Sequence, residues 1–401
     1  MKNLLVIETD GAFEIKKECE AFGWHPVFVK TQSYTNWLPL DKSNQETDVR
    51  LISELSHFEV IKLMLEENIN GILPISLLEP QAVRDSLVKD YIHNHKIPVN
   101  IVANSPATME STFDKWLTKV ILSHFQIPVT PSKLISTVED IDDVAKAYSF
   151  PMIVKERKSY TGMGVRMVNS EEELVKYATR NIKKGLFAEP FLSGSEISME
   201  VIAWNGELFF QPLVYKGETR LNIIEHPAYR PRISPYKPGS ILESKIISIV
   251  SESVKHLQLN GAAEFEFLIV DGEPLIMEIN PRISGVTRLC NAAGGANAYK
   301  ELAHLCINNA MRKDLTISQH KYAIQFPLNV LPEGDLLKKM QQDPHISYIK
   351  PITWMPFLPI KSNVIMSYDT PDELFNGVKS FENFTDPRYI TEAVQAFDYF
   401  T

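Results

Sequence analysis

The sequence predicts an α/β protein with α+β parts, and three observations support this fold class. Residues 1 to about 105 alternate short apolar runs with helical patterns, which is typical of parallel strands joined by crossover helices. Residues 196 to about 290 are rich in strand-forming residues. A chain of 401 residues is too long for one compact core, so we expect two to four domains.

Four short apolar runs in the N-terminal region are expected to be buried strands, at residues 4–7, 27–29, 71–75 and 99–102. Gly11 follows the first run alone, without the glycine-rich turn that holds the phosphates of a dinucleotide. We therefore expect residues 1–105 to form a parallel α/β domain that shapes one side of a cleft.

Residues 106–195 are predicted to form a connecting helix and a small α+β unit. The helix covers residues 111–125, and a connector with two prolines follows at residues 127–131. The expected elements of the unit are a helix capped by Thr137, strands at residues 152–155 and 165–168, and a helix that begins with a capping box of Ser170 and Glu173.

Two further regions complete the chain. Residues 196–312 are predicted to form a strand-rich central lobe, and a loop with proline and arginine interrupts it at residues 216–239. Residues 313–401 form a last α+β region, in which no motif identifies a substrate. Together with 1–105 and 106–195, these ranges are the domains that the sequence predicts.

Composition excludes several classes of protein. The net charge is −9 and no cluster of lysine and arginine is present, so we expect no nucleic-acid partner. Three cysteines without paired spacing indicate neither a disulfide framework nor a zinc site, which suits a reducing compartment. The N-terminus reads as a first strand, and no apolar stretch approaches the roughly 18 residues of a membrane helix. We therefore expect a cytoplasmic protein.

A hairpin near residue 270 carries the strongest chemical signal. Residues 263–270 and 275–280 are predicted strands, and residues 271–274 form the turn. At two-residue spacing, Glu278, Asn280 and Arg282 lie on one face if the strand continues through Pro281. Mg²⁺ prefers hard oxygen ligands such as these carboxylate and amide groups.

Glu266 is the expected cross-strand partner of Glu278. Two facing carboxylates repel each other unless a cation lies between them. A loop of two or four residues would place the two glutamates on opposite faces, so we predict an odd-numbered loop with Gly272 in the left-handed conformation. Either glutamate alone also fits an outward position on an amphipathic strand, and only the combination with Asn280 and Arg282 favours a metal site.

This segment begins with Glu-Phe and ends with Glu-Ile-Asn-Pro-Arg, and the pattern resembles the magnesium-binding signature of the ATP-grasp superfamily. The resemblance implies an ATP-grasp fold with an N-terminal parallel α/β domain, a small mobile lobe and a central antiparallel-sheet lobe. It implies that Glu266, Glu278 and Asn280 bind Mg²⁺, with Mn²⁺ as an alternative. Arg282 would be the catalytic residue, in contact with the transferred phosphate group.

The same resemblance assigns residues to the phosphates of ATP. Lys155 ends a predicted strand just before a loop that contains Gly162 and Gly164. Glycines let backbone N–H groups approach phosphates closely, and the lysine adds a point charge. Lys115, in Phe-Asp-Lys, matches a second phosphate-facing lysine of the family, and this assignment depends on the resemblance alone.

The adenosine side follows from residues 186–196. In the family, Glu189 would accept a hydrogen bond from the adenine amino group, and the backbone of Phe191 and Leu192 would contact the ring edge. Glu196 would hold the ribose, because a carboxylate can accept two hydrogen bonds from a diol.

The resemblance implies an ADP-forming ligase that phosphorylates a carboxylate and joins the acyl phosphate to an amine. Arg282 is followed by Ile-Ser-Gly-Val, which differs from biotin carboxylase and from several purine enzymes and is closer to the ligases of amino acids or peptides. Arg288 is the first candidate for binding the incoming carboxylate, and Arg220, Arg230 and Arg232 are alternatives.

Two other functions stay open at this point: a carboxylating or carbamoylating enzyme, and a nucleotide-binding regulator without catalysis. The expected partners are small-molecule carboxylate and amine substrates and a second copy of the chain in a homodimer.

Overall fold

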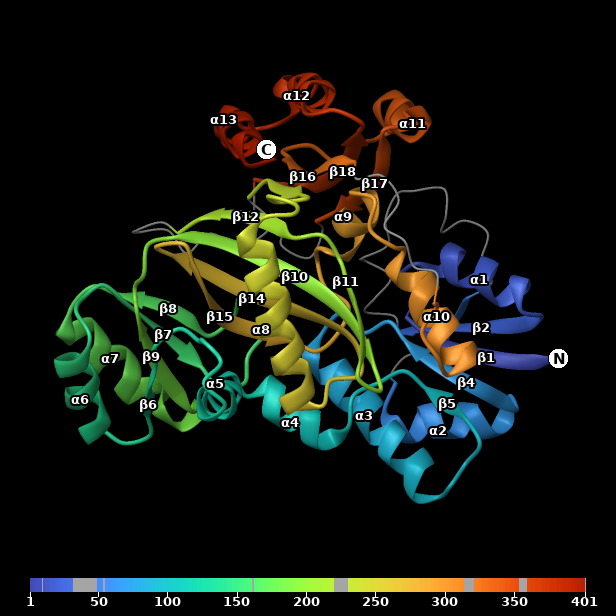
Figure 1. Cartoon of the computed structure of the whole chain (residues 1–401), viewed down its shortest axis with the longest axis horizontal. Helices are drawn as coiled ribbons and strands as arrows, with labels where there is room; N and C mark the ends of the chain where they lie inside the picture. Colours follow the sequence, from blue (N-terminus) through green and yellow to red (C-terminus); the bar gives the residue numbers. More distant parts are fainter. Residues whose placement is uncertain are drawn as a thin grey trace.

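The computed structural model describes residues 1–8, 10–31, 49–52, 55–160, 162–219, 230–313, 321–352 and 359–400, and the statements below concern these residues. They form a five-stranded, a four-stranded and a nine-stranded sheet. In Figure 1 the N-terminal sheet and the small four-stranded lobe lie on either side of the central sheet, and the C-terminal strands extend that sheet. None of the described helices is long and apolar enough to cross a membrane.

The N-terminal sheet is parallel, with strand order β3-β2-β1-β4-β5. All four strands expected from the sequence are present, and β3 was not predicted. The elements are β1 (Lys2–Ile7), α1 (Ala12–Ala21), β2 (Trp24–Thr31), β3 (Val49–Ile52), α2 (His57–Glu66), β4 (Ile69–Pro74), α3 (Glu79–Asn94) and β5 (Asn100–Ile101).

The connecting segment contains two helices, α4 (Pro106–Phe113) and α5 (Lys115–His124), so the prediction of one helix over 111–125 was wrong. The break lies at Asp114, whose ψ of 96° is extended and whose carboxylate accepts from Leu117 N at 3.1 Å as the cap of α5. Arg157 binds the same carboxylate. Asp114 thus places Lys115 at the first turn of a new helix.

The small lobe has an antiparallel sheet of order β6-β9-β7-β8. Thr137 accepts from Asp140 N at 3.3 Å, as predicted. Ser170 accepts from Glu173 N, but the Glu173 carboxylate accepts from Asn169 N, so only half of the predicted capping box forms. The elements are β6 (Lys133–Ile135), α6 (Glu139–Ala147), β7 (Met152–Glu156), β8 (Val165–Val168), α7 (Glu171–Asn181), the 3₁₀ turn Ile182–Lys184 and β9 (Leu186–Pro190).

The central sheet has the order β15-β14-β10-β12-β13-β16-β18-β17, and β11 pairs with the far part of β10. Its strands are β10 (Ser195–Trp204), β11 (Glu207–Phe210), β12 (Val214–Glu218), β13 (Arg232–Ser234), β14 (Gly261–Val270), β15 (Glu273–Asn280), β16 (Tyr322–Leu328), β17 (Ile346–Pro351) and β18 (Ser362–Tyr368). Its helices are α8 (Ile241–Leu257), α9 (Thr287–Ala292), α10 (Ala298–Asn308), α11 (Gly334–Gln342), α12 (Pro371–Lys379) and α13 (Pro387–Ala396), with 3₁₀ turns at Glu382–Phe384 and Phe397–Tyr399.

The proposed domain 196–312 shares structure with two of the other proposed domains, 313–401 and 1–105. The central sheet continues past residue 313, because β13 pairs with β16. Helix α10 belongs to the range of the central lobe, but its residues Tyr299 and Leu302 pack in one hydrophobic cluster with Leu4 and Val6 of β1. The four ranges stay a proposal for how the chain divides into domains.

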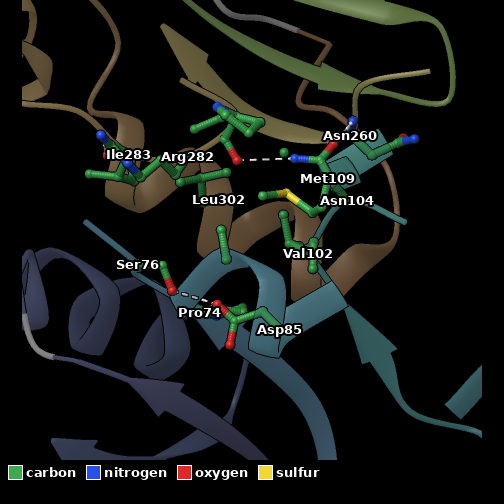
Figure 2. Close-up of a pocket in the computed structure, with 15 residues that line it drawn as sticks. Pro74, Ser76, Asp85, Val102, Asn104, Met109, Asn260, Arg282, Ile283 and Leu302 are labelled. Atoms are coloured by element: carbon green, nitrogen blue, oxygen red, sulfur yellow. Dashed lines mark hydrogen bonds between the residues drawn. The ribbon is translucent and has the colours of Figure 1, made fainter. Parts of the chain in front are cut away.

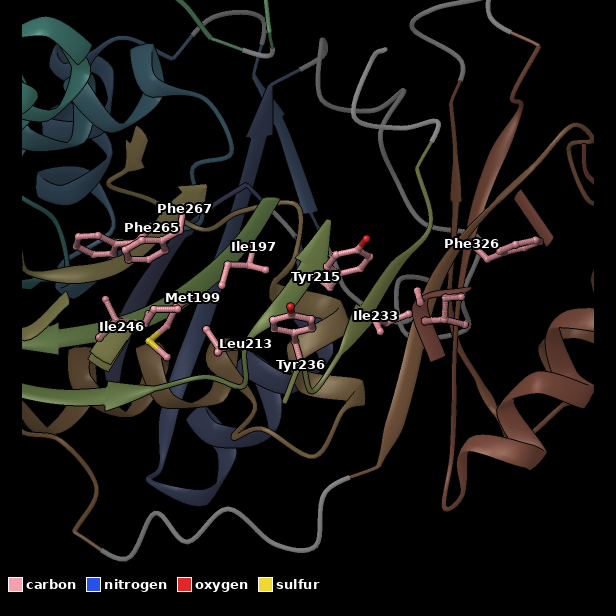
Figure 3. Close-up of a cluster of buried hydrophobic side chains, with 14 of the residues drawn as sticks. Ile197, Met199, Leu213, Tyr215, Ile233, Tyr236, Ile246, Phe265, Phe267 and Phe326 are labelled. Carbon is pink, nitrogen blue, oxygen red and sulfur yellow. The ribbon is translucent and has the colours of Figure 1, made fainter. Parts of the chain in front are cut away.

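One face of the central sheet is a hydrophobic core, which Figure 3 shows. Phe265 and Phe267 of β14 point into it together with Met199 of β10 and Ile246 of α8. Since side chains alternate along a strand, the intervening even-numbered residues of β14 lie on the opposite face. The core therefore sets the face on which the candidate carboxylates are displayed.

The turn between β14 and β15 differs from the prediction. Val270 pairs with Glu273, so the loop consists of Asp271 and Gly272 alone. Their φ angles are 51° and 81°, as a type I′ turn requires. The predicted odd-numbered loop was wrong, although Gly272 does adopt the left-handed conformation.

The pairing of Glu266 with Glu278 is nevertheless confirmed, for a different reason. Phe267 pairs with Ile276 and Glu266 pairs with Glu278, which leaves Met277 as one extra residue on β15. This β-bulge shifts the register by one and brings the two glutamates to the same face of the sheet.

Candidate active site

A pocket of about 470 Å³ lies where the three sheets meet. This volume suits a small-molecule ligand. Loops after β1 and β4, strands of the small lobe and one face of the central sheet contribute to its wall. The predicted site residues that line it are Lys155, Gly162, Glu189, Phe191, Leu192, Glu196, Glu266, Glu278, Asn280, Arg282 and Arg288. Lys115 and Gly164 lie just outside this lining, and Arg220 falls outside the described residues.

The two facing glutamates differ in their electrostatic environment. Burial raises the pKa of Glu278, Lys115 acts against this, and Glu266 raises it further. Burial has the same effect on Glu266, but Lys216 and Arg232 outweigh it and the net pKa of Glu266 is lowered. A cation between the two carboxylates would remove their mutual repulsion.

Each carboxylate of this pair has a cationic partner. Lys115 Nζ lies 3.3 Å from Glu278 Oε1, and Lys216 Nζ lies 3.0 Å from Glu266 Oε2. Asn280 Nδ2 donates to Glu266 Oε1 at 3.1 Å, and its amide oxygen accepts from Arg282 NH2 at 3.5 Å. The oxygen-rich donor set fits a hard cation such as Mg²⁺.

Glu189 forms a buried charge network with two lysines. Lys119 Nζ lies 2.6 Å from Oε1 and Lys155 Nζ lies 2.7 Å from Oε2, and Thr130 also donates to Oε1, at 3.0 Å. Burial acts to raise the pKa of Glu189, but the two lysine charges outweigh it and lower this pKa to about 2. The carboxylate is therefore ionised and holds Lys155, which lines the pocket.

The glycine loop between β7 and β8 turns tightly over Glu156. Gly162 and Gly164 both have φ of 73°, in the left-handed region that favours glycine. A Cβ on Gly164 would lie 2.7 Å from the Glu156 side chain, whereas Gly162 faces open space. Elsewhere at this end of the pocket, Arg230 pairs with Glu196 at 3.1 Å.

Arg282 is held by the N-terminal domain. Its NH2 group lies 2.6 Å and its Nε 2.9 Å from Glu79 Oε1, at the start of α3. Asn104 holds the neighbouring Pro281, because its amide donates to the Pro281 carbonyl at 3.1 Å, and this bond is the dashed line at Asn104 in Figure 2. Arg282 is therefore oriented before any ligand binds.

Arg288 is engaged by several groups. Its NH2 lies 2.9 Å from Asp10 Oδ1, its NH1 lies 3.2 Å from Glu14 Oε1, and the guanidinium stacks near the rings of Tyr299 and Tyr348 at 4.7 and 4.8 Å. These contacts tie α9 to the N-terminal domain. They engage NH1 and NH2, whereas Nε of Arg288 has no hydrogen-bond partner among the described residues.

The sequence interpretation missed Glu264, Lys119, Lys216 and Lys350. Glu264 lies two residues before Glu266 and also contacts Lys216, at 3.4 Å, so the strand period could have indicated it. Lys119 lies one helical turn after Lys115, which is a comparable signal. Lys350 reaches the pocket from β17, and no local motif marks it.

This fold and this pocket have the features expected of a nucleotide-dependent enzyme. Buried lysines, paired carboxylates and an oriented arginine between two lobes are suited to positioning phosphate groups around a divalent cation.

Comparison with known proteins agrees with this class. The ATP-grasp domain family matches residues 112–286. A carbamoyl-phosphate synthase of Methanobrevibacter smithii is 24% identical over 278 residues, which cover 69% of this chain and 74% of that protein. Residues 112–286 therefore match an ATP-grasp domain.

Two solved structures share the fold. An L-amino acid ligase from Bacillus licheniformis matches with a TM-score of 0.74 at 18% identity, over 96% of this chain and 98% of that one. The biotin carboxylase domain of 2-oxoglutarate carboxylase from Hydrogenobacter thermophilus, a dimer in complex with MgADP and bicarbonate, matches with a TM-score of 0.71 at 15% identity, over 99% of both chains.

Proposed function

We propose that this enzyme transfers the γ-phosphoryl group of ATP to a carboxylate and joins the acyl phosphate to an amine, with release of ADP and phosphate. The observation that supports it best is the pairing of Glu266 with Glu278 across the bulge, in a pocket that also contains Lys155 and Arg282. Facing carboxylates surrounded by cationic side chains favour a divalent cation together with phosphate groups.

Glu266, Glu278 and Asn280 would hold Mg²⁺, or Mn²⁺ in its place. When bound, the cation would neutralise negative charge on the phosphates. Lys115 contacts Glu278 and Lys216 contacts Glu266 in the structure. A cation bound by these two carboxylates would replace the lysines as their partner and leave both ammonium groups for a phosphate. Their side chains would then neutralise the polyphosphate.

The nucleotide would lie between the small lobe and the central sheet. Arg282, oriented by Glu79, would stabilise the charge that develops on the transferred group and on the acyl oxygen. The proposed nucleotide contacts are Lys115, Lys155, Gly162 and Gly164 for the phosphates, Glu189, Phe191 and Leu192 for adenine, and Glu196 for ribose.

Amino acids or peptides are the proposed amine substrates, and they are also a proposed class of carboxylate. The fold of an L-amino acid ligase over nearly the whole chain supports this class. A carboxylating or carbamoylating reaction is the second candidate, and the similarity to a carbamoyl-phosphate synthase favours it. A cytoplasmic location, a homodimer, the lack of a nucleic-acid partner and the roles of Arg288 and Arg220 stay predictions.

Phosphate release from MgATP over a panel of amino acids, dipeptides and bicarbonate tests the proposal. We expect release that requires both a carboxylate and an amine, with ADP formed in equal amount. Release that depends on bicarbonate and not on an amino acid would support the carboxylating reaction. No ADP with any member of the panel would favour a regulator that binds nucleotide without catalysis.

A further inference from the structure

The C-terminal strands form one wall of the pocket. Arg232, Gln325, Ile365 and Tyr348 lie directly opposite one another on β13, β16, β18 and β17, and all four line the cavity. Residues that face each other across antiparallel strands share a face of the sheet. This row therefore marks the face of the C-terminal strands that lines the pocket. In Figure 1 these strands lie next to α9.

One step along the same strands, Lys350 of β17 pairs with Asn363 of β18, and both line the pocket. Asn363 is 6% exposed, and its Oδ1 has no hydrogen-bond partner among the described residues. A buried acceptor of this kind costs free energy unless a ligand supplies a donor. The position thus provides a cation and an acceptor side by side.

The charges around Lys350 favour an anion. Asp10 is the nearby carboxylate, but Arg288 binds its Oδ1 and Tyr299 donates to its Oδ2. Burial lowers the pKa of Lys350; Asp10 acts in the opposite direction, and Arg232 and Arg288 lower the pKa further. An anionic group bound here would stabilise the ammonium form.

We propose that Lys350 and Asn363 form the subsite for the amine substrate, with Lys350 binding its free carboxylate and Asn363 Oδ1 accepting from its N–H. A group with a carboxylate next to an N–H is the backbone of an α-amino acid. The inference rests on the proposed function and makes it more specific. It assigns the choice of amine substrate to the C-terminal strands, whereas Arg282 acts on the carboxylate that is phosphorylated by stabilising its developing negative charge.

The test compares an amino acid with its C-terminal amide, for example L-alanine with L-alaninamide, which lacks only the negative charge. For the amino acids that the phosphate-release panel identifies, wild-type enzyme should prefer the acid by about tenfold to 100-fold in kcat/KM, the range for a hydrogen bond to a charged group. Lys350→Met should reduce this preference to about twofold, through KM for the amine, without a change in KM for ATP.

Two variants serve as controls. Lys338→Met removes an exposed lysine of α11 and should behave as wild type. Lys350→Arg keeps the charge and should retain most of the preference, which separates loss of charge from a folding defect. Lys350→Met with an unchanged preference for the acid would overturn the proposal.

Binding distinguishes a failure of this subsite from a failure of the proposed function. Calorimetry with L-alanine and L-alaninamide on enzyme saturated with MgADP requires no turnover. Tighter binding of the acid, lost in Lys350→Met, would support the subsite even if no ADP forms with any panel member. Equal binding of acid and amide by the wild type would reject it.

Discussion

The two ends of the pocket are built in different ways. At the nucleotide end, residues from short, continuous segments meet: Glu266 and Glu278 come from one hairpin, and Lys115 and Lys119 come from one helix. At the amine end, Lys350 and Asn363 come from the consecutive strands β17 and β18, which no motif marks, and Arg232 comes from β13, far earlier in the sequence. We propose phosphoryl transfer at the first end and selection of the amine substrate at the second.

This difference explains why one end could be interpreted from the sequence and the other could not. A motif is a local pattern, and it identifies residues that a single hairpin or helix brings together. The wall with Lys350 exists only after β16, β17 and β18 have joined the sheet of β13. We therefore expect nucleotide-end variants to affect all substrates equally, and amine-end variants to discriminate between them.

Removal of the divalent cation should have the largest effect on activity. A bound metal supplies several kcal/mol of charge stabilisation, so a chelator should reduce phosphate release by about 1,000-fold or more. Addition of Mg²⁺ or Mn²⁺ should restore it, and Lys350→Met should show the same metal dependence as wild type. Unchanged release with excess chelator would remove the metal role from Glu266 and Glu278.

Arg282→Ala should lower kcat by about 100- to 1,000-fold, which corresponds to the loss of one donor to a developing negative charge. The affinity for ATP should stay within about threefold, because its other proposed contacts remain. Single-turnover kinetics and nucleotide titration measure the two quantities. Arg180→Ala, at an exposed position of α7, is the matched control. Near-normal turnover in Arg282→Ala would exclude it as the catalytic arginine.

Glu200→Gln tests a buried carboxylate of β10 that binds Ser284 and Thr287, in the segment between Arg282 and Arg288. Ser284 donates to Glu200 Oε2 at 3.2 Å, Thr287 also donates to it, and burial raises the pKa of Glu200 to about 8. Because the folded pKa is above the unfolded one, wild type loses stability as the pH rises from about 4.5 to about 8, and the loss is constant above that.

Glutamine cannot ionise, so the Glu200→Gln variant should gain stability relative to wild type on the order of 4 kcal/mol at pH 8 and only about 1 kcal/mol at pH 5. Urea unfolding of both proteins at the two pH values measures this difference. A difference that does not change with pH would contradict the shifted pKa of Glu200.

Lys155→Ala should have the smallest effect of the four, about a tenfold rise in the Kd for ATP. The effect is limited because Lys119 and Thr130 still hold Glu189. Lys184→Ala, an exposed lysine that binds Glu156, is the control. If KM for the amine rose and the affinity for ATP did not, Lys155 would belong to the other end of the pocket.

Much of the fold followed from sequence patterns, and the errors have physical causes. Apolar runs identified four strands of the N-terminal sheet, but β3 has a mixed pattern that no periodicity marks. The helix break at Asp114 has a local signal, because aspartate is a preferred helix cap and Asp114 accepts from Leu117 N. The interpretation of one continuous helix overlooked it, and the bond from Arg157, more than 40 residues away, could not be seen in a local window.

The hairpin shows the same limit within the site. The order of the residues in the motif was enough to identify Glu266 and Glu278 as candidate metal ligands. The turn sequence Asp-Gly is itself a signal for a two-residue type I′ turn. Counting residues through a regular ladder then separated Glu266 from Glu278, because it did not include a bulge. The extra residue Met277 shifts the register by one. Glu266 and Glu278 therefore pair although the turn has only two residues.

Transfer of labelled oxygen tests the central claim most directly. The carboxylate substrate is prepared with ¹⁸O in its carboxyl group, and the phosphate released with MgATP and an amine is analysed by mass. If the carboxylate attacks the γ-phosphorus and the amine then attacks the acyl carbon, each phosphate carries one ¹⁸O atom. Formation of the amide product with unlabelled phosphate would contradict acyl phosphate formation in this enzyme.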